Sequence, residues 1–582
     1  MQKILKHKLI PPFTTALIAA LIAVPVLLNL LFIYRYGVNC VFWDQWGIVP
    51  LFDKLYAGNL SFADLFALHN EHRILLPRLV MLGLGSLTHY NTVAEMYLSW
   101  LLLCIICFIL FKLFVRLFGF SKMTMAKFIP VVWLVFGLRQ YDNLLWGFQL
   151  VYFMVVLFFL LAVYLLAESK KVDWRFGLAI VCGMASTFSL AGGLLVWPVG
   201  LIQILFTART RAKRLGGLDI VKTATWTIAG IAVYILYFTG YTQPQHTVNL
   251  LYSLQHPGIA GMFGLVAMGN PLSNDQYTAA SIGLLLLIMY ILVGAALFCK
   301  PRTWKLKFPF LSLVIFTIAV AGVLAVTRSE WGEGTAMVSR YATMTMMGVI
   351  GLYLLAISID WQNINYKYFL SGFLCSLIVG GLIVTDITAY FNIGYAMHAE
   401  RRLAAYYLET YQYQSDENLA KLLPWPDVLK ERVHTLVKYN LNVFSEPQLT
   451  GSDLKPLSAG PLFYIEEVNG KRPPSQEPLS LQFEGVETLR IKGWAIDQNN
   501  GKAAGGVLLD IDGRLEVPAL YGLDRPDIAD FHKNNNYRFS GFEAAAGTSL
   551  VGPGQHDISI KVISADGKEY YTPVKILTLN IQ

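Results

Sequence analysis

The chain has 582 residues, of which 55% are hydrophobic and only 14% are charged, with a mean hydropathy of +0.50 and a net charge of +8. A soluble chain of this length needs more charge on its surface, so the composition excludes a purely soluble protein and indicates an integral membrane protein. Most Lys and Arg residues stand in short segments between apolar runs, so the positive charge gives no reason to expect a nucleic-acid partner.

Apolar runs of about 20 residues recur along the first two thirds of the chain, and each is long enough to cross a hydrocarbon core of roughly 30 Å. The first run follows Lys3, Lys6 and Lys8, but it is too long for a signal-peptide core and lacks a small-residue cleavage site, so we predict a retained anchor. The predicted spans are residues 13–35, 94–116, 127–138, 147–166, 175–188, 190–206, 221–240, 278–299, 308–327, 342–360 and 369–388.

Basic residues mark alternate connections between these spans. They are Lys122 and Lys127; Lys170, Lys171 and Arg175; Arg209, Arg211, Lys213 and Arg214; and Lys300, Arg302, Lys305 and Lys307. The positive-inside rule therefore predicts a cytoplasmic N-terminus, and eleven crossings place everything after residue 388 on the non-cytoplasmic side.

The first predicted external loop, residues 36–93, begins with Trp43, Asp44, Gln45 and Trp46. Two tryptophans close to the end of a span are typical of the interfacial belt, which would hold Asp44 at headgroup depth. Amphipathic stretches at 49–56 and 62–68 and a short apolar segment at 74–84 are expected to lie along the membrane surface above a polar site.

A polar run from His69 to Arg73 stands between these surface segments. Five consecutive polar residues before an apolar segment favour a binding site. Two other interpretations stay open: Asp44 only caps a surface helix and the run is a solvated turn, or His69 and His72 share a helix face and bind a divalent metal ion with Glu71. The spacing matches no strong zinc signature such as HExxH, so a divalent metal ion stays an open alternative and no other cofactor is predicted.

Further polar residues are predicted at the same side of the membrane. Ionisable groups at such depth usually line a cavity or pair with one another. Arginines there suit a lipid phosphate, because guanidinium binds phosphate oxygens in a bidentate way. The polar residues predicted at this side of the membrane are Arg139, Gln149, Arg328, Arg340 and Tyr341. The alternative is that Arg328 or Arg340 pairs with Glu330 or Glu333.

The tail is predicted to contain an external helical segment at 391–445, a linker at 446–461 and a β-sandwich at 462–582. The β prediction rests on short stretches with period-two alternation, separated by Gly, Asn and Asp clusters. The expected fold is thus a polytopic α-helical membrane protein with a C-terminal all-β domain.

The layout of residues 1–390 resembles the GT-C class of membrane glycosyltransferases, which take sugars from polyprenyl-phosphate carriers. Asp44 takes the position of that class's catalytic Asp beyond the first span. The segment 69–77 stands where family-39-like members carry a basic-Pro-Pro-Leu segment. The chain lacks the Asp-Glu pair of that family, which leaves Glu71 as the candidate second carboxylate.

The resemblance implies transfer of a sugar from a polyprenyl-phosphate donor to a glycan or lipid acceptor of the envelope, at the periplasmic face of the bacterial inner membrane. Asp44 and Glu71 are the catalytic candidates, and Arg340, Arg139 and Arg328 are the candidate phosphate ligands. The sugar or acceptor ligands are His69, His72, Arg73, Gln149 and Tyr341. The tail resembles a β-sandwich module of envelope glycosyltransferases in segments 493–497, 525–527 and 541–542, which are either fold signatures or a carbohydrate-binding surface.

Two other functions are alternatives for a chain of this layout. A lipid-linked sugar transporter predicts repeated halves and charges at the membrane midplane, and the sequence shows no evident repeat. A glycan-binding envelope protein needs far fewer spans for anchoring. Both observations favour the transferase.

Overall fold

The computed structural model describes residues 12–209, 217–242, 251–298, 304–358, 364–446, 451, 454–472, 479–483, 488–547 and 551–581. The chain forms two compact units: a helical unit of residues 1–37 and 51–397, and a C-terminal unit of residues 38–50 and 398–582. This division of the chain falls after Met397. The start of the first predicted loop, residues 38–50, belongs to the C-terminal unit.

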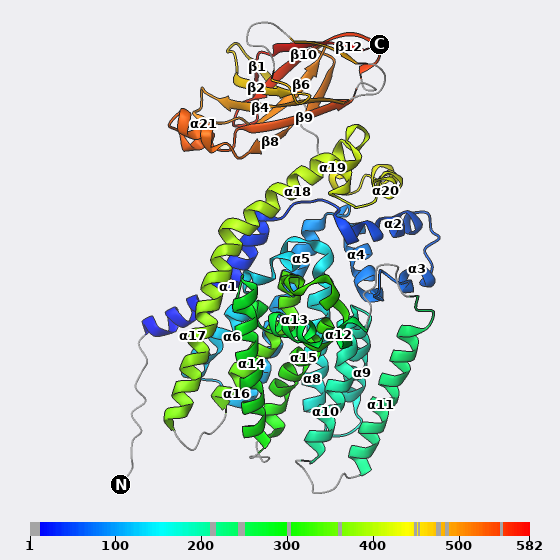
Figure 1. Ribbon diagram of the computed structural model, residues 1–582, viewed down its shortest axis with the longest axis vertical. Coiled ribbons are helices and arrows are strands. Elements are labelled where there is room, and N and C mark those ends of the chain that lie inside the picture. Colours follow the sequence, from blue (N-terminus) through cyan, green and yellow to red (C-terminus); the bar gives the residue numbers. More distant parts are fainter. Residues whose placement is uncertain are drawn as a thin grey trace. The chain divides into compact units, whose positions relative to one another are not determined.

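Long helices lying side by side make up the helical unit (Figure 1). They are α1 (Pro12–Tyr36), α5 (Thr92–Phe118), α8 (Leu150–Glu168), α10 (Val196–Arg209), α11 (Gly217–Phe238), α14 (Gln276–Phe298), α15 (Trp304–Arg328), α16 (Ala342–Ser358) and α17 (Ile364–Thr388). Each belongs to one of the nine described helical segments that are long and apolar enough to cross a membrane. A multi-pass membrane protein is therefore confirmed, with about nine candidate spans in place of eleven.

The two remaining predicted spans are short helices. Residues 127–138 and 175–188 correspond to α6 (Lys122–Val135) and α9 (Trp174–Thr187), each of 14 residues. At 1.5 Å per residue each is about 21 Å long, below the roughly 30 Å of the hydrocarbon core. Both pack within the helical unit, α6 against α1 and α9 against α8.

Residues 241–277, which connect the predicted spans 221–240 and 278–299, are largely helical in their described part. It contains α12 (Tyr252–Gln255) and α13 (Pro257–Gly269), with Pro257 at the first helical position. A Cβ added at Gly269 or Gly283 would lie 1.9 Å from a carbonyl oxygen of the facing helix. The backbones of α13 and α14 therefore touch, a packing that only small residues permit.

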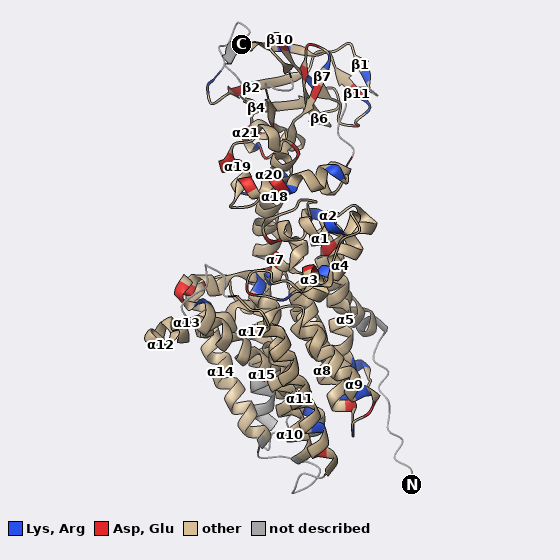
Figure 2. Cartoon of the chain, turned by 90° about the vertical axis from the view of Figure 1, so that its right-hand side faces the viewer, with Lys and Arg blue, Asp and Glu red and all other residues tan. Residues whose placement is uncertain are grey.

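Charges avoid the middle of the long helices. In Figure 2, α14 and α15 carry almost no blue or red between their ends. Large apolar side chains point outward instead, including Ile228, which is 67% exposed, and Ile291, which is 63% exposed. Exposed apolar side chains along such long helices indicate a lipid environment.

The C-terminal unit contains most of α18 (Gly394–Glu409), then α19 (Asp416–Ala420), α20 (Pro426–Lys438) and two β-sheets. One sheet has the order β1-β11-β10-β12-β3, with β6 on β10 and β7 on β6; the other has the order β2-β4-β9-β8, with β5 on β4. The strands are β1 (Lys455–Leu457), β2 (Leu462–Val468), β3 (Leu479–Phe483), β4 (Thr488–Asp497), β5 (Lys502–Ala503), β6 (Gly506–Ile511), β7 (Leu515–Pro518), β8 (Leu520–Leu523), β9 (Gly541–Gly547), β10 (Gly554–Ile563), β11 (Glu569–Tyr571) and β12 (Val574–Ile581), and α21 (Pro526–Phe531) follows β8.

Alternate residues of both sheets share one core, which includes Ile491, Leu509, Phe542 and Ile560. The predicted two-sheet β domain is therefore confirmed. The predicted linker 446–461 contains β1, which pairs with β11. Helix α18 also contacts the sheet of β4 and β9, since the Ala545 N–H donates to the Tyr406 hydroxyl.

Candidate functional site

The sequence-predicted site residues fall in both units. Asp44 lies in the C-terminal unit, and all the others lie in the helical unit. Within the helical unit they stand at helix ends and in short 3-10 turns. Arg139 lies in η2 (Leu138–Gln140), Gln149 in η3 (Gly147–Gln149), Arg328 at the end of α15, and Arg340 and Tyr341 in η9 (Ser339–Tyr341).

The polar run 69–73 forms a tight turn. The His69 N–H donates to the His72 carbonyl at 2.7 Å, and the His72 N–H donates to the His69 carbonyl at 2.9 Å. Asn70 sits at the tip with φ of +51°, a left-handed conformation that Asn tolerates. His69 and His72 therefore do not share a helix face, which corrects that interpretation. The described residues hold no cluster of His, Cys, Asp and Glu that could bind a metal ion.

Glu71 and Arg328 form an ion pair, in which both side chains are mostly buried, at 23% and 18% exposure. The His72 Nε2 lies 3.6 Å from the Glu71 carboxylate, and the Arg328 guanidinium lies 4.4 Å from the Trp331 ring centre. Arg328 thus contacts Glu71 of the first loop. Glu333, one of the partners that the sequence suggested for Arg328, accepts a hydrogen bond from the Gln276 side chain at 3.2 Å. A candidate carboxylate and a candidate phosphate ligand meet here.

Arg73 is held by backbone carbonyls. It donates to the carbonyls of Tyr237 and Phe66, both at 2.6 Å, and to that of Thr239, and its guanidinium lies 4.4 Å from the Phe66 ring centre. These contacts fasten the polar turn to the end of α11. These hydrogen bonds explain how the Arg73 side chain is buried. Its role as a ligand stays a prediction.

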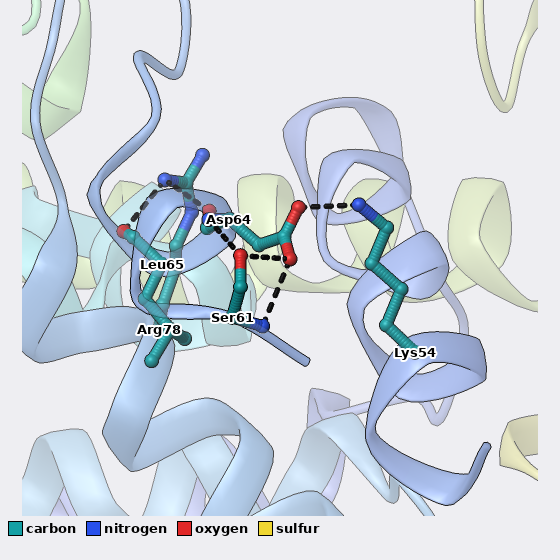
Figure 3. Close-up of polar contacts among 5 residues, drawn as sticks. All are labelled: Lys54, Ser61, Asp64, Leu65 and Arg78. Atoms are coloured by element: carbon teal, nitrogen blue, oxygen red, sulfur yellow. Dashed lines mark hydrogen bonds and ion pairs between the residues drawn. The ribbon is translucent and has the colours of Figure 1, made fainter. Parts of the chain in front are cut away.

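Short helices next to the turn are fastened in the same way (Figure 3). The helix α3 (Phe62–Phe66) has a capping box of Ser61 and Asp64, and Lys54 from α2 (Val49–Tyr56) forms an ion pair with Asp64. Bonds from Lys54 and Ser61 lower the pKa of Asp64. Arg78, in α4 (Leu75–Thr88), donates to the Leu65 carbonyl at 2.9 Å. Helices form at all three predicted segments, and Arg78, which anchors α3 to α4, was missed.

A second polar group surrounds Arg139, which is 2% exposed. Its Nε donates to the Ser273 carbonyl at 3.0 Å and its Nη2 to the Met337 carbonyl at 2.7 Å, while Nη1 has no hydrogen-bond partner among the described residues. Burial lowers the pKa of Arg139, and Tyr141 acts against this effect. The Asn143 side chain donates to the Arg340 carbonyl at 3.0 Å. The segment 328–341 therefore contacts Glu71 at its start and the Arg139 group at its end.

The remaining candidates differ in accessibility. Arg340 is partly exposed, and its guanidinium lies 6.0 Å from the centre of the Tyr341 ring, which is buried. Gln149 is also buried. The His69 ring packs on Phe148 with 4.9 Å between ring centres, so the polar turn lies directly beside η3.

Two carboxylates inside the helices were missed by sequence reasoning. Glu95 of α5 is fully buried, and a Cβ added at Gly147 would lie 2.3 Å from its Oε2. Asp386 of α17 accepts the Leu138 N–H at 2.7 Å, one residue before Arg139. The available signal was a single carboxylate in an otherwise apolar span, which is by default a functional candidate.

Asp44 lies in η1 (Trp43–Gly47), within the C-terminal unit. The Trp43 N–H donates to the Leu422 carbonyl at 2.8 Å, and Arg432 donates to the Trp46 carbonyl at 2.9 Å. Trp46 is fully buried and Trp43 is 45% exposed, so only one of the two tryptophans is available for the predicted interfacial belt. Asp44 itself is partly exposed.

The segments that prompted the resemblance of the β domain have internal partners. The Asp497 carboxylate accepts the Ala565 N–H at 2.7 Å, Arg525 forms ion pairs with Glu466 and Asp527, and Phe542 lies in the core. A Cβ at Gly493 would lie 2.2 Å from the Tyr464 carbonyl oxygen. These contacts favour a role in the fold for the individual residues Gly493, Asp497 and Phe542.

Comparisons with protein-family models, with curated proteins and with solved structures find no match to this chain.

Proposed function

We propose that this protein is a membrane glycosyltransferase that moves a sugar from a polyprenyl-phosphate carrier to a glycan or lipid acceptor of the cell envelope. The observation that supports the proposal most is the ion pair of Glu71 and Arg328. It joins a candidate base and a candidate phosphate ligand that come from separate segments of a unit with about nine candidate spans. The basic connections between spans support a reaction on the non-cytoplasmic face of a bacterial inner membrane.

The proposed reaction needs one base and one anion-binding group. The acceptor hydroxyl attacks C1 of the donor sugar, and its proton passes to a carboxylate. The bond from C1 to the phosphate oxygen breaks, and its electron pair leaves with the polyprenyl phosphate. Because this leaving group is a stable anion, no second carboxylate has to protonate it, unlike in glycoside hydrolysis. A positioned base contributes about 10²–10⁴-fold, and cations at the phosphate contribute further.

In this proposal Arg328 binds the donor phosphate and thereby releases Glu71. The phosphate competes with the Glu71 carboxylate for one guanidinium, so donor binding frees Glu71 to accept the proton of the acceptor. Arg340, which is partly exposed, is the second phosphate ligand. His69, His72, Gln149 and Tyr341 are proposed to contact the sugar or the acceptor, and Asp44 is the alternative base.

The test uses the purified full-length protein in detergent with polyprenyl phosphates that carry radiolabelled hexoses and with envelope lipids and polysaccharides as acceptors. Loss of label from the carrier measures transfer. We expect Glu71→Gln and Arg328→Gln each to lower the rate by at least about 10²-fold. The matched control is Arg116→Gln, because Arg116 forms an ion pair with Glu168 elsewhere in the helical unit.

Three results would contradict the proposal. They are no consumption of any labelled donor by the wild type, equal losses of rate in the control and in the two test variants, and movement of the donor across a vesicle bilayer without consumption. The last result identifies a lipid-linked sugar transporter.

A further inference from the structure

The smaller sheet of the C-terminal unit carries two aromatic residues side by side on its outer face. Tyr464 of β2 and Trp494 of β4 are directly opposite each other in the antiparallel pair. Their chain neighbours Ile465 and Ala495 belong to the core, so Tyr464 and Trp494 stand on the other face of the sheet. Residues opposite each other in such a pair have Cβ atoms about 4.5–5.5 Å apart.

Part of this aromatic pair is open to solvent. Tyr464 is 42% exposed, and Trp494 is partly exposed. Trp494 packs against a small cluster of Ile496, Ile528 and Tyr537, and the His532 ring meets it edge-on with 5.7 Å between ring centres. The indole is therefore held in place from one side while part of its surface stays accessible.

Two exposed carboxylates are fixed beside the pair by one arginine. Glu466 is the extra residue of a β-bulge in β2, next to Ile465, and bulges commonly redirect side chains at binding sites. Arg525 donates to Glu466 at 2.9 and 2.7 Å and to Asp527 at 2.9 and 2.6 Å. The carboxylates are 41% and 61% exposed, so they retain accessible oxygen lone pairs.

The two carboxylates beside the aromatic pair are balanced by two arginines. The Arg472 side chain donates to the Tyr464 hydroxyl at 3.2 Å, so Arg472 and Arg525 balance Glu466 and Asp527. The bond to Arg525 lowers the pKa of Asp527, which stays ionised and acts only as an acceptor at neutral pH. A surface of this kind suits a ligand that is uncharged and rich in hydroxyl donors.

We propose that Tyr464, Trp494, Glu466 and Asp527, called the Tyr464 face, bind an uncharged saccharide. The electron-rich ring faces attract the C–H groups of a pyranose, and the two carboxylates accept its hydroxyl protons. Because Arg525 and His532 already hold these groups, little side-chain freedom is lost on binding. A surface on which two arginines only balance two carboxylates offers anionic lipid headgroups no net attraction, which disfavours a membrane surface as the partner. The inference does not depend on the proposed transferase activity.

The test measures binding of the full-length protein in detergent to cellulose, β-1,3-glucan, mannan and galactan by co-sedimentation. We expect at least one of these probes to bind the wild type. Tyr464→Ala should weaken that binding at least about tenfold, whereas Tyr464→Phe, which keeps the ring, should stay within about threefold. The control is Val574→Ala, an exposed apolar residue on the other sheet, which should leave binding unchanged.

Amide exchange of β4 in each variant checks that the sheet remains folded. The inference is overturned if no probe binds the wild type, or if folded Tyr464→Ala binds like the wild type. It is also overturned if the same variants lose binding to anionic phospholipid vesicles while no saccharide binds. Loss of saccharide binding with unchanged consumption of the polyprenyl-phosphate donor supports a separate binding role.

Discussion

The carboxylate of Asp497 accepts a hydrogen bond from the hydroxyl of Tyr571, and it also accepts the Asn500 side-chain amide at 2.7 Å. Burial acts to raise the pKa of Asp497, but its hydrogen bonds outweigh burial and lower it. Burial, followed by the bond to Asp497, raises the pKa of Tyr571 to about 12. The contact joins the end of β4 to β11 at the rim of the β domain.

This pair predicts a pH window for the stability of the β domain. The pKa of Asp497 is lower in the folded state, so its contribution is complete above the unfolded pKa of about 4 and is lost as the pH falls through the folded value. The pKa of Tyr571 is higher in the folded state, so its contribution is complete below about pH 10 and is lost as the pH rises through about 12. Amide exchange of β4 and β11 between pH 3 and pH 11 measures the onset of both losses.

Replacing Tyr571 with Phe should destabilise the β domain by about 1.5–3 kcal/mol, because a buried carboxylate loses a hydrogen-bond donor. The matched control is Tyr570→Phe. This change also removes one hydroxyl, but it keeps the ring, whose centre lies 4.7 Å from the Lys561 Nζ. Chemical unfolding followed by tryptophan fluorescence compares the two variants. An unchanged midpoint for Tyr571→Phe would show that the hydroxyl does not stabilise Asp497.

The packing of α13 on α14 predicts a position-specific effect of alanine. A Cβ at Gly283 would lie 1.9 Å from the Leu265 carbonyl oxygen, so Gly283→Ala must separate two helix backbones. We expect a loss of about 1–3 kcal/mol, seen as a lower melting temperature in detergent. Gly294→Ala on the same helix meets nothing within 4 Å and should melt like the wild type.

The side of the membrane on which residue 172 lies depends on whether the short helix α6 crosses the membrane. If α6 crosses the membrane, a reporter fused after Val172 is cytoplasmic, because α1, α5, α6 and α8 then make four crossings. If α6 turns back, the reporter is external. The basic residues Lys170, Lys171 and Arg175 favour the cytoplasm, and we expect that result. A reporter after Arg214 should be cytoplasmic, and one after Gln582 should be external.

Asp44→Asn tests the alternative base. The change keeps the volume of the side chain and removes its basicity, so transfer should fall by at least about 10²-fold if Asp44 accepts the proton of the acceptor. Purification yield and melting temperature should match those of the wild type. Comparison with Glu71→Gln identifies the base. A carboxylate that can be replaced without lowering the wild-type rate does not accept the proton.

Composition and periodicity were sufficient to predict that the chain contains membrane helices and β-strands. Long apolar runs, interrupted by basic connections, have no stable state in water and therefore predict membrane helices. Period-two alternation in the tail predicts strands with one face in a core, as seen in β4 and β12. Both signals are local, because they depend only on neighbouring residues along one segment.

The partners of polar groups were not readable from the sequence, because a side chain's partner depends on which segments meet. Local spacing suggested Glu330 or Glu333 for Arg328, whereas the tertiary structure pairs it with Glu71 of a distant turn. It also places Asp44 in the unit of α19 and α20, where the Trp43 N–H donates to the Leu422 carbonyl. Between the predicted spans 221–240 and 278–299 it forms the helix α13. Apolar content alone determined that the chain enters a membrane, whereas hydrogen-bond satisfaction inside the folded units decided which charges meet.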